Sequence, residues 1–97
     1  MFKSLDPLLH SQLRLGVISL LVSVEEADFT FIKEKTGATA GNLSVQIDKL
    51  EKAKYIEVTK SFKGKRPLTT CKITKTGVHA FEQYVEHLKT YIDKEDH

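Results

Sequence analysis

Small and polar side chains gather between residues 39 and 46, together with one valine whose immediate neighbours are Ser44 and Gln46. Asn42 and Gln46 carry amides, which present a donor and an acceptor side by side and can therefore pair with adenine. Val45 could pack on the methyl group of thymine. The competing interpretation is a helix cap followed by a solvated face. The candidate contact residues of this stretch are Thr39, Gly41, Asn42, Ser44, Val45, Gln46 and Lys49.

A basic stretch follows this polar cluster. Residues 58–75 contain six basic side chains and no acidic one, whereas residues 80–97 contain five acidic side chains and two lysines. A charge run is usually only a solvated surface, but a run this one-sided also indicates a surface that binds a polyanion. Three basic side chains around Gly64 could contact phosphates, and the arginine could enter a minor groove. Alternatively, the lysines only protect a hairpin edge from aggregation. The three are Lys63, Lys65 and Arg66.

Helical periodicity predicts two elements before the polar cluster. Asp6 and Pro7 are typical of a helix start, and apolar residues at helical spacing predict a helix over residues 7–24. A short helix over residues 30–36 follows, and Gly37 is expected to end it in a left-handed conformation.

The polar cluster itself is predicted to lie on a helix over residues 40–53, which Thr39 caps. Its buried stripe consists of Leu43, Ile47 and Leu50, which leaves the opposite face outward. The outward residues are Gly41, Val45, Asp48 and Lys52, flanked by Asn42, Ser44 and Lys49. Asp48 would repel phosphate, and we expect it to pair with Lys52 at the i,i+4 spacing. Two helices joined by a short glycine-containing turn indicate a helix-turn-helix.

Strand-forming residues predict two strands, over residues 55–62 and 68–73, joined by a turn that carries the basic tip. The faces of Lys60 and Lys72 depend on the register of these strands. Thr74 then caps a last helix. The predicted order is α-α-α-β-β-α. We therefore expect a mainly α, α+β winged helix-turn-helix fold that forms one domain over residues 1–97.

Three segments together resemble the short winged-helix regulators related to the MarR (multiple antibiotic resistance regulator) group. They are "GNLSVQIDKLEKAKYIE", "FKGKRPLTT" and "ITKTGVHAFEQY". The resemblance covers Asp6 to about Ile92, and its pattern is specific only when the three segments are taken jointly. It implies a winged-helix fold, homodimerisation through the terminal helices, and regulation of transcription by binding to double-stranded DNA.

One position departs from that family pattern. The family usually has glycine after the third helix, in an "AGYI" motif, where this chain has Lys54. If the turn needs a positive φ angle, a lysine there is strained. The chain is also shorter than full-length members of the group, so we expect it to lack their longer dimerisation helices and the associated ligand pocket.

The last helix suggests self-association. Its apolar residues step by three and four over two heptads, and a small domain has little surface to cover a helix of about twenty residues. Burial of the seam against the first helix of the same subunit is the alternative. Tyr84 and Tyr91 lie off the seam and are expected to stay partly exposed. The expected dimer interface is Leu9, Leu13, Phe81, Tyr84, Val85, Leu88, Tyr91 and Ile92.

Nothing in the sequence predicts catalysis. The four histidines do not have a metal-binding spacing, and we expect no catalytic residue, no metal and no cofactor. The single cysteine, Cys71, excludes an internal disulfide framework and suits a reducing compartment. It is expected to be a core residue, with a redox-sensing thiol as the alternative.

The overall composition is typical of a globular protein, with 40% hydrophobic and 29% charged residues among 97. No apolar run approaches the roughly 20 residues that span a bilayer, and the N-terminus lacks a signal-peptide core. We therefore expect a cytoplasmic protein without a membrane partner. Our hypothesis is a homodimeric regulator that binds specific double-stranded DNA, and the alternative is a winged-helix protein-interaction module. The sequence leaves the operator and any small-molecule effector undefined.

Overall fold

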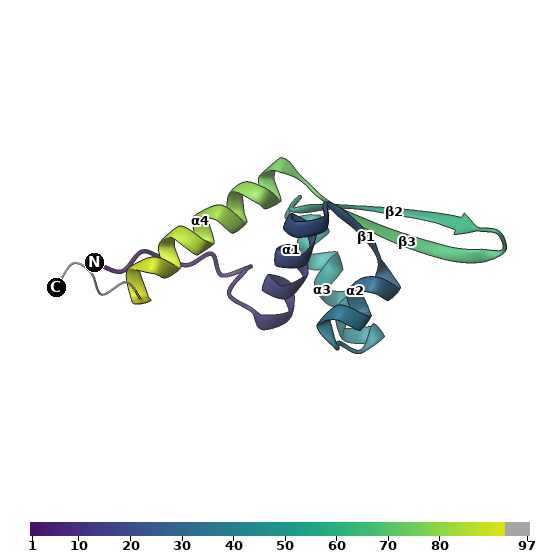
Figure 1. Cartoon of the computed structure of the whole chain (residues 1–97), viewed down its shortest axis with the longest axis horizontal. Helices are drawn as coiled ribbons and strands as arrows, with labels where there is room; N and C mark the ends of the chain where they lie inside the picture. The colour runs from purple at the N-terminus through teal and green to yellow at the C-terminus, as the bar shows by residue number, and fades with distance from the viewer. Residues whose placement is uncertain (93–97) are drawn as a thin grey trace.

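The computed structural model describes residues 1–92. Three helices pack together in the middle of the molecule, a long hairpin projects to one side, and the last helix leaves on the other, with the N-terminal residues alongside it (Figure 1). This arrangement confirms the predicted α-α-α-β-β-α order, and it adds one short strand. The elements are α1 (Gln12–Val24), β1 (Glu26–Asp28), α2 (Phe29–Thr36), α3 (Ala40–Lys52), β2 (Ile56–Lys63), β3 (Arg66–Ile73) and α4 (Lys75–Ile92).

The sheet is antiparallel, with the strand order β1-β3-β2. The added strand, β1, pairs Ala27 with Cys71 of β3. It has only three residues, and Glu26 and Asp28 are poor strand formers, so the strand pattern is absent from the sequence. Its pairing with β3 instead depends on residues more than forty positions away.

A single apolar core connects all of the helices to the base of the sheet. The predicted stripe on α3 is confirmed, because Leu43, Ile47 and Leu50 are all buried. Burying a side chain of this size contributes about 1.5–3 kcal/mol relative to leaving it exposed. The buried core residues are Leu9, Val17, Ile18, Leu21, Ile32, Leu43, Ile47, Leu50, Ile56, Cys71 and Tyr84.

The first helix begins later than the sequence predicts. Asp6 accepts the backbone N–H of Leu8 on Oδ1 at 2.9 Å, and its carbonyl accepts the N–H of His10. These bonds close a separate turn, because Ser11 is extended (φ −152°) and interrupts the helical path before Gln12. The expected start at Pro7 is therefore wrong: aspartate and proline initiate a turn here, and α1 starts five residues further on.

Caps at the other helix ends follow the predicted rules. Gly37 ends α2 with a φ angle of 71°, and the Thr39 hydroxyl accepts the N–H of Asn42 at 3.2 Å. Thr74 accepts the N–H of Gly77 at 3.0 Å at the start of α4. These caps satisfy backbone groups that the helices leave without partners, and they fix where each helix starts or ends.

The turn after α3 is a Schellman motif with a lysine in the position where glycine is usual. Lys54 has a φ angle of 65°. Its N–H donates to the Glu51 carbonyl at 2.9 Å, and the N–H of Tyr55 donates to the Leu50 carbonyl at 3.0 Å. The departure noted in the sequence is therefore a real strain, since a side chain in this conformation costs about 1–2 kcal/mol.

Replacing Lys54 with glycine is expected to raise the free energy of unfolding by about 0.5–1 kcal/mol. The relief of about 1–2 kcal/mol exceeds the greater backbone entropy that glycine loses on folding, which is about 0.5–1 kcal/mol. Urea denaturation followed by circular dichroism measures the change. Lys49→Gly, within α3, is the control and should instead lower stability by about 1 kcal/mol. Equal losses in both variants would contradict the strain at Lys54.

Candidate nucleic-acid interface

The outer face of α3 carries the predicted polar cluster. Gly41, Asn42, Ser44 and Lys49 are exposed, and Val45 keeps 52% of its surface in contact with solvent. Beyond its chain neighbours and the adjacent helix backbone, no heavy atom would lie within 4 Å of a Cβ added at Gly41, so the outer side of α3 is open to close approach there. The N-terminal half of α3 therefore exposes small and polar side chains together with one apolar side chain, Val45.

Gln46 belongs to a hydrogen-bond network that links α3 to α1. Its Oε1 accepts a hydrogen bond from Nη1 of Arg14 on α1, and its Nε2 donates to Oδ1 of Asn42 at 3.0 Å. The Arg14 Nε donates in turn to the carbonyl of Leu8 at 2.6 Å. The amide of Gln46 is thus engaged at both ends and half-buried, and its pairing with adenine stays a prediction. Gln46 fixes the orientation of the exposed Asn42 amide.

Asn42 keeps the groups that a base contact needs. Its carbonyl oxygen has a second lone pair beyond the one that Gln46 uses, and its amide nitrogen remains available as a donor. Arg14 is the residue that sequence reasoning missed in this network. The sequence around Arg14 does not indicate this contact, because its partner on α3 lies 32 positions further along the chain.

The expected partner of Asp48 is confirmed. Its Oδ2 lies 2.9 Å from Nζ of Lys52, one turn later on α3. This hydrogen bond and the attraction of the carboxylate raise the pKa of Lys52 above its ordinary value. The negative charge of Asp48 is thus paired on the exposed surface, away from the N-terminal residues of the helix.

A groove separates α3 from the hairpin. It has a volume of about 480 Å³, and its lining includes Ser44, Val45 and Asp48 from α3 together with Lys60 of β2. The register pairs Lys60 with Thr69, which also lines the groove. The sequence left open which face of the hairpin carries Lys60. The register shows that it lies on the face that points toward α3.

Lys72 lies on the opposite face of the sheet. The register places it between Glu57 on β2 and Glu26 on β1, so acidic positions flank it on both neighbouring strands. Opposite charges at directly paired positions stabilise an antiparallel sheet by a few tenths to about 1 kcal/mol. This lysine accordingly belongs to the sheet surface and not to the groove beside α3.

The hairpin of β2 and β3 ends in the predicted basic tip. Gly64 has a φ angle of 66°, which suits glycine in the tight turn. Lys63, Lys65 and Arg66 are all exposed around it. Figure 1 shows that the tip projects well beyond the helices, so these three cations are available to a large partner.

Comparison with known proteins decides the family. The profile of a winged helix DNA-binding domain family matches residues 13–92 of the chain. The chain belongs to this family. An uncharacterized protein of Methanocaldococcus jannaschii is 37% identical over 76 residues, which cover 78% of this chain and 83% of that protein.

Solved structures agree with the winged-helix assignment. A transcriptional regulator homologue from Pyrococcus horikoshii has a TM-score of 0.82 and 30% identity, over 89% of this chain and 85% of that one. A MarR-family transcriptional regulator from Silicibacter pomeroyi shares the fold at a TM-score of 0.68, with 15% identity over 89% of this chain and 57% of that one. The winged-helix DNA-binding fold that the resemblance implies is thus confirmed.

The surface formed by α4 and the N-terminal residues, called the terminal face below, differs in part from the predicted dimer interface. Leu9 and Tyr84 are buried inside the subunit, and the Tyr84 hydroxyl lies 3.1 Å from Nδ1 of His10. The expectation that Tyr84 stays partly exposed is therefore wrong, because the N-terminal turn covers it. Of the other expected interface residues, Leu13, Phe81 and Leu88 are half-buried, whereas Val85, Tyr91 and Ile92 are exposed.

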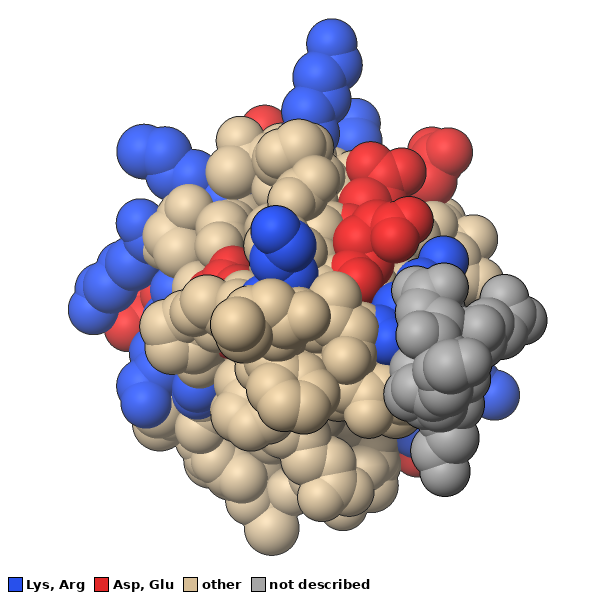
Figure 2. Space-filling model, turned by 90° about the vertical axis from the view of Figure 1, so that its left-hand side faces the viewer, with Lys and Arg blue, Asp and Glu red and all other residues tan. Residues whose placement is uncertain are grey.

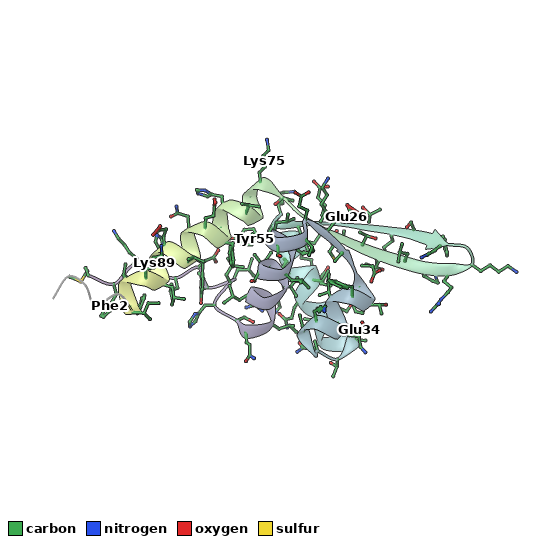
Figure 3. All side chains as sticks on the ribbon, viewed as in Figure 1. Phe2, Glu26, Glu34, Tyr55, Lys75 and Lys89 are labelled. Carbon is green, nitrogen blue, oxygen red and sulfur yellow. The ribbon has the colours of Figure 1, made fainter. Side chains whose placement is uncertain are left out.

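The N-terminal residues extend this face along the end of α4. The ring of Phe2 stacks on Tyr91 with 4.7 Å between centroids, beside the last turns of the helix (Figure 3). The Tyr91 hydroxyl donates to the Lys3 carbonyl at 2.8 Å, and the His87 ring contacts the Ser4 carbonyl at 2.9 Å. Figure 2 looks at this end of the molecule and shows an uncharged area in its lower centre.

The described residues offer no support for a thiol switch or a metal centre. Cys71 is fully buried, and burial raises the pKa of its thiol to about 11, so little reactive thiolate forms at neutral pH. Within residues 1–92, no group of three or more histidine, cysteine, aspartate or glutamate side chains could hold a metal ion. None of the described helices is long and apolar enough to cross a membrane.

Proposed function

We propose that this protein regulates transcription by binding specific double-stranded DNA as a homodimer, with α3 in the major groove and the basic wing on the flanking backbone. The observation that carries the proposal is the shared orientation of two surfaces. Ser44 and Val45 on the exposed face of α3 line one groove with Lys60 of the hairpin, and the cationic tip lies beyond it.

The contacts follow from the chemistry of each exposed group. Thr39 and the backbone near Gly41 suit phosphate oxygens at the start of a helix. Asn42 suits adenine, Val45 suits a thymine methyl group, and Lys49 suits phosphate. Gln46 acts in this proposal as the positioning residue for Asn42, and Ser44 adds a hydroxyl at the groove.

Dimerisation supplies a second α3, which contacts the second half-site of the DNA. A single α3 offers few base contacts, and a two-fold dimer reads two half-sites about 34–36 Å apart on one side of the duplex. The exposed apolar residues of α4 and the stacked pair of Phe2 and Tyr91 support an interface at the terminal face. The Methanocaldococcus jannaschii relative covers a similar length, so its assembly state is a useful parallel measurement.

Selection of bound DNA from a random duplex pool tests the proposal, followed by two variants on the recovered duplex. Arg66→Ala should weaken binding to all duplexes and reduce the slope of log affinity against log salt by about two for the dimer, because each subunit loses one phosphate or minor-groove cation. Asn42→Ala should relax the preference at one base pair of each half-site and leave the slope unchanged. A pool without any preference, even at low salt, would instead favour a protein-interaction module.

A further inference from the structure

Phe62 on the wing is the most exposed aromatic residue of the part of the chain that the structure describes, with 74% of its surface accessible. It lies on β2 one residue before the basic tip, and its partner across the hairpin is Pro67. Figure 3 shows no other element near this end of the hairpin, so the fold does not use the ring for packing. Apart from its cross-strand pairing with Pro67, this phenylalanine has no partner in the subunit that would account for it, which points to a role in a complex.

The strand register places Phe62 on the groove side of the wing. Side chains alternate along a strand, so Phe62 shares a face with Val58 and Lys60, which line the groove beside α3. Four residues of strand separate Phe62 from Val58, which is about 13 Å at 3.3 Å per residue. That displacement is comparable to half a turn of DNA, about 17 Å, which separates a major groove from the next minor groove.

The surroundings of the ring favour DNA over an apolar protein partner. Phe62 lies between Lys60 and Lys63 on its own strand, and Pro67 follows Arg66 on the other. All three cations are exposed. Narrow minor grooves attract such cations, and minor-groove proteins combine them with apolar wedges, phenylalanine and proline among them, that separate base steps and kink the duplex by about 20–90°.

We propose that Phe62, backed by Pro67, is a wedge that enters the minor groove beside the site of α3 and bends the DNA. This inference rests on the proposed function, because it needs α3 and the wing to engage one duplex. It adds a specificity device that the basic tip alone does not provide, since a wedge favours steps that unstack easily, such as TA and CA/TG.

Phe62→Ser tests the wedge on a 30-base-pair duplex that carries the selected site, with a donor and an acceptor dye at its two ends. We expect affinity to fall about tenfold for each half-site, or about 100-fold for the dimer, which is within the range for loss of one aromatic–base stack per subunit. The change in energy transfer that reports bending should disappear. The salt slope should stay unchanged because no charge is removed, which distinguishes this variant from Arg66→Ala.

Two matched variants make the test specific to the position of the ring. Phe62→Leu keeps an apolar wedge and should retain most of the bend. The exchange Ser61→Phe with Phe62→Ser keeps the composition but moves the ring to the opposite face, and should behave like Phe62→Ser. Circular dichroism checks that the hairpin persists in each variant.

Two results would overturn the wedge while leaving the proposed DNA binding intact. One is Phe62→Ser with full affinity and full bending, while Arg66→Ala still lowers the salt slope. The other is an exchange variant that bends DNA as the unaltered protein does. If the unaltered protein binds no duplex at all, the proposed function fails, and the wedge fails with it.

Discussion

Gly77→Ala is expected to lower the free energy of unfolding by about 3 kcal/mol or more, the upper range for overpacking. A Cβ at this position would lie 2.2 Å from the carbonyl oxygen of Tyr55 and 2.8 Å from Cδ1 of Ile73. The carbonyl cannot easily move away, because it accepts the backbone N–H of Thr74 at 3.2 Å and the Thr74 hydroxyl at 3.0 Å. The start of α4 would have to shift from β2, in a domain whose total stability is only about 5–15 kcal/mol.

Gly16→Ala is the matched control for this prediction. Gly16 lies within α1, and an added Cβ would meet only the methyl group of Thr36, at 4.0 Å. Alanine should therefore raise stability there by up to about 1 kcal/mol, since it favours the helix more than glycine does. Thermal and urea unfolding of both variants measure the pair. An unfolding free energy for Gly77→Ala within 1 kcal/mol of the unaltered protein would contradict the close approach of α4 to Tyr55.

Sequence reasoning succeeded where a feature depends on neighbours within about one helical turn. Thr39 bonds to a group three residues away, and Gly37 and Lys54 end helices by conformations that their own turns impose. The stripe of α3 follows directly from the 3.6-residue period. Local rules of this kind operate before any tertiary contact exists, so one sequence is enough to find them.

Sequence reasoning failed where a feature depends on distant partners. The strand β1 exists only because β3 pairs with it, and Tyr84 is buried only because the turn around Leu9 and His10 reaches it across more than seventy positions. The late start of α1 has the same origin. Asp6 Oδ2 accepts a hydrogen bond from the Tyr55 hydroxyl, so the N-terminal turn is held against the base of the sheet instead of continuing a helix.

The candidate DNA-binding surface has one feature that the sequence predicts and one that it does not. Exposure of Asn42 and Val45 follows from helical phase, which the sequence predicts well. The engagement of Gln46 by Arg14 does not, because a polar side chain at the edge of a helix can turn toward solvent or toward a neighbouring helix with equal local geometry. The hydrogen bond between Gln46 and Arg14 could therefore be found only from the three-dimensional contact between α1 and α3.

Val85→Glu is expected to convert the proposed dimer into monomers, with an increase in the dimer dissociation constant of about 100-fold or more. Val85 keeps 37% of its surface exposed in the subunit, and Tyr91 and Ile92 on the same terminal face keep 45% and 65%. Two-fold symmetry introduces the charge twice into one interface, and an uncompensated charge buried there costs about 3 kcal/mol or more. Sedimentation velocity over a range of concentrations measures the change in mass.

The consequence for DNA binding makes this variant informative beyond its mass. A monomer has lost the second DNA-binding subunit and cannot bind two half-sites at once. Its affinity for a duplex with two half-sites should therefore fall by a factor of about 100 or more. Affinity for a single half-site should remain unchanged, because α3 and the tip of the wing lie away from the C-terminal part of α4 (Figure 1). Gln83→Glu, an exposed polar position on the same helix, adds the same charge and should leave both mass and affinity unaltered. Val85 is the better choice than the half-buried Leu88, whose side chain packs against the core of the subunit. A Val85→Glu protein that keeps the mass of the unaltered protein would place the interface elsewhere.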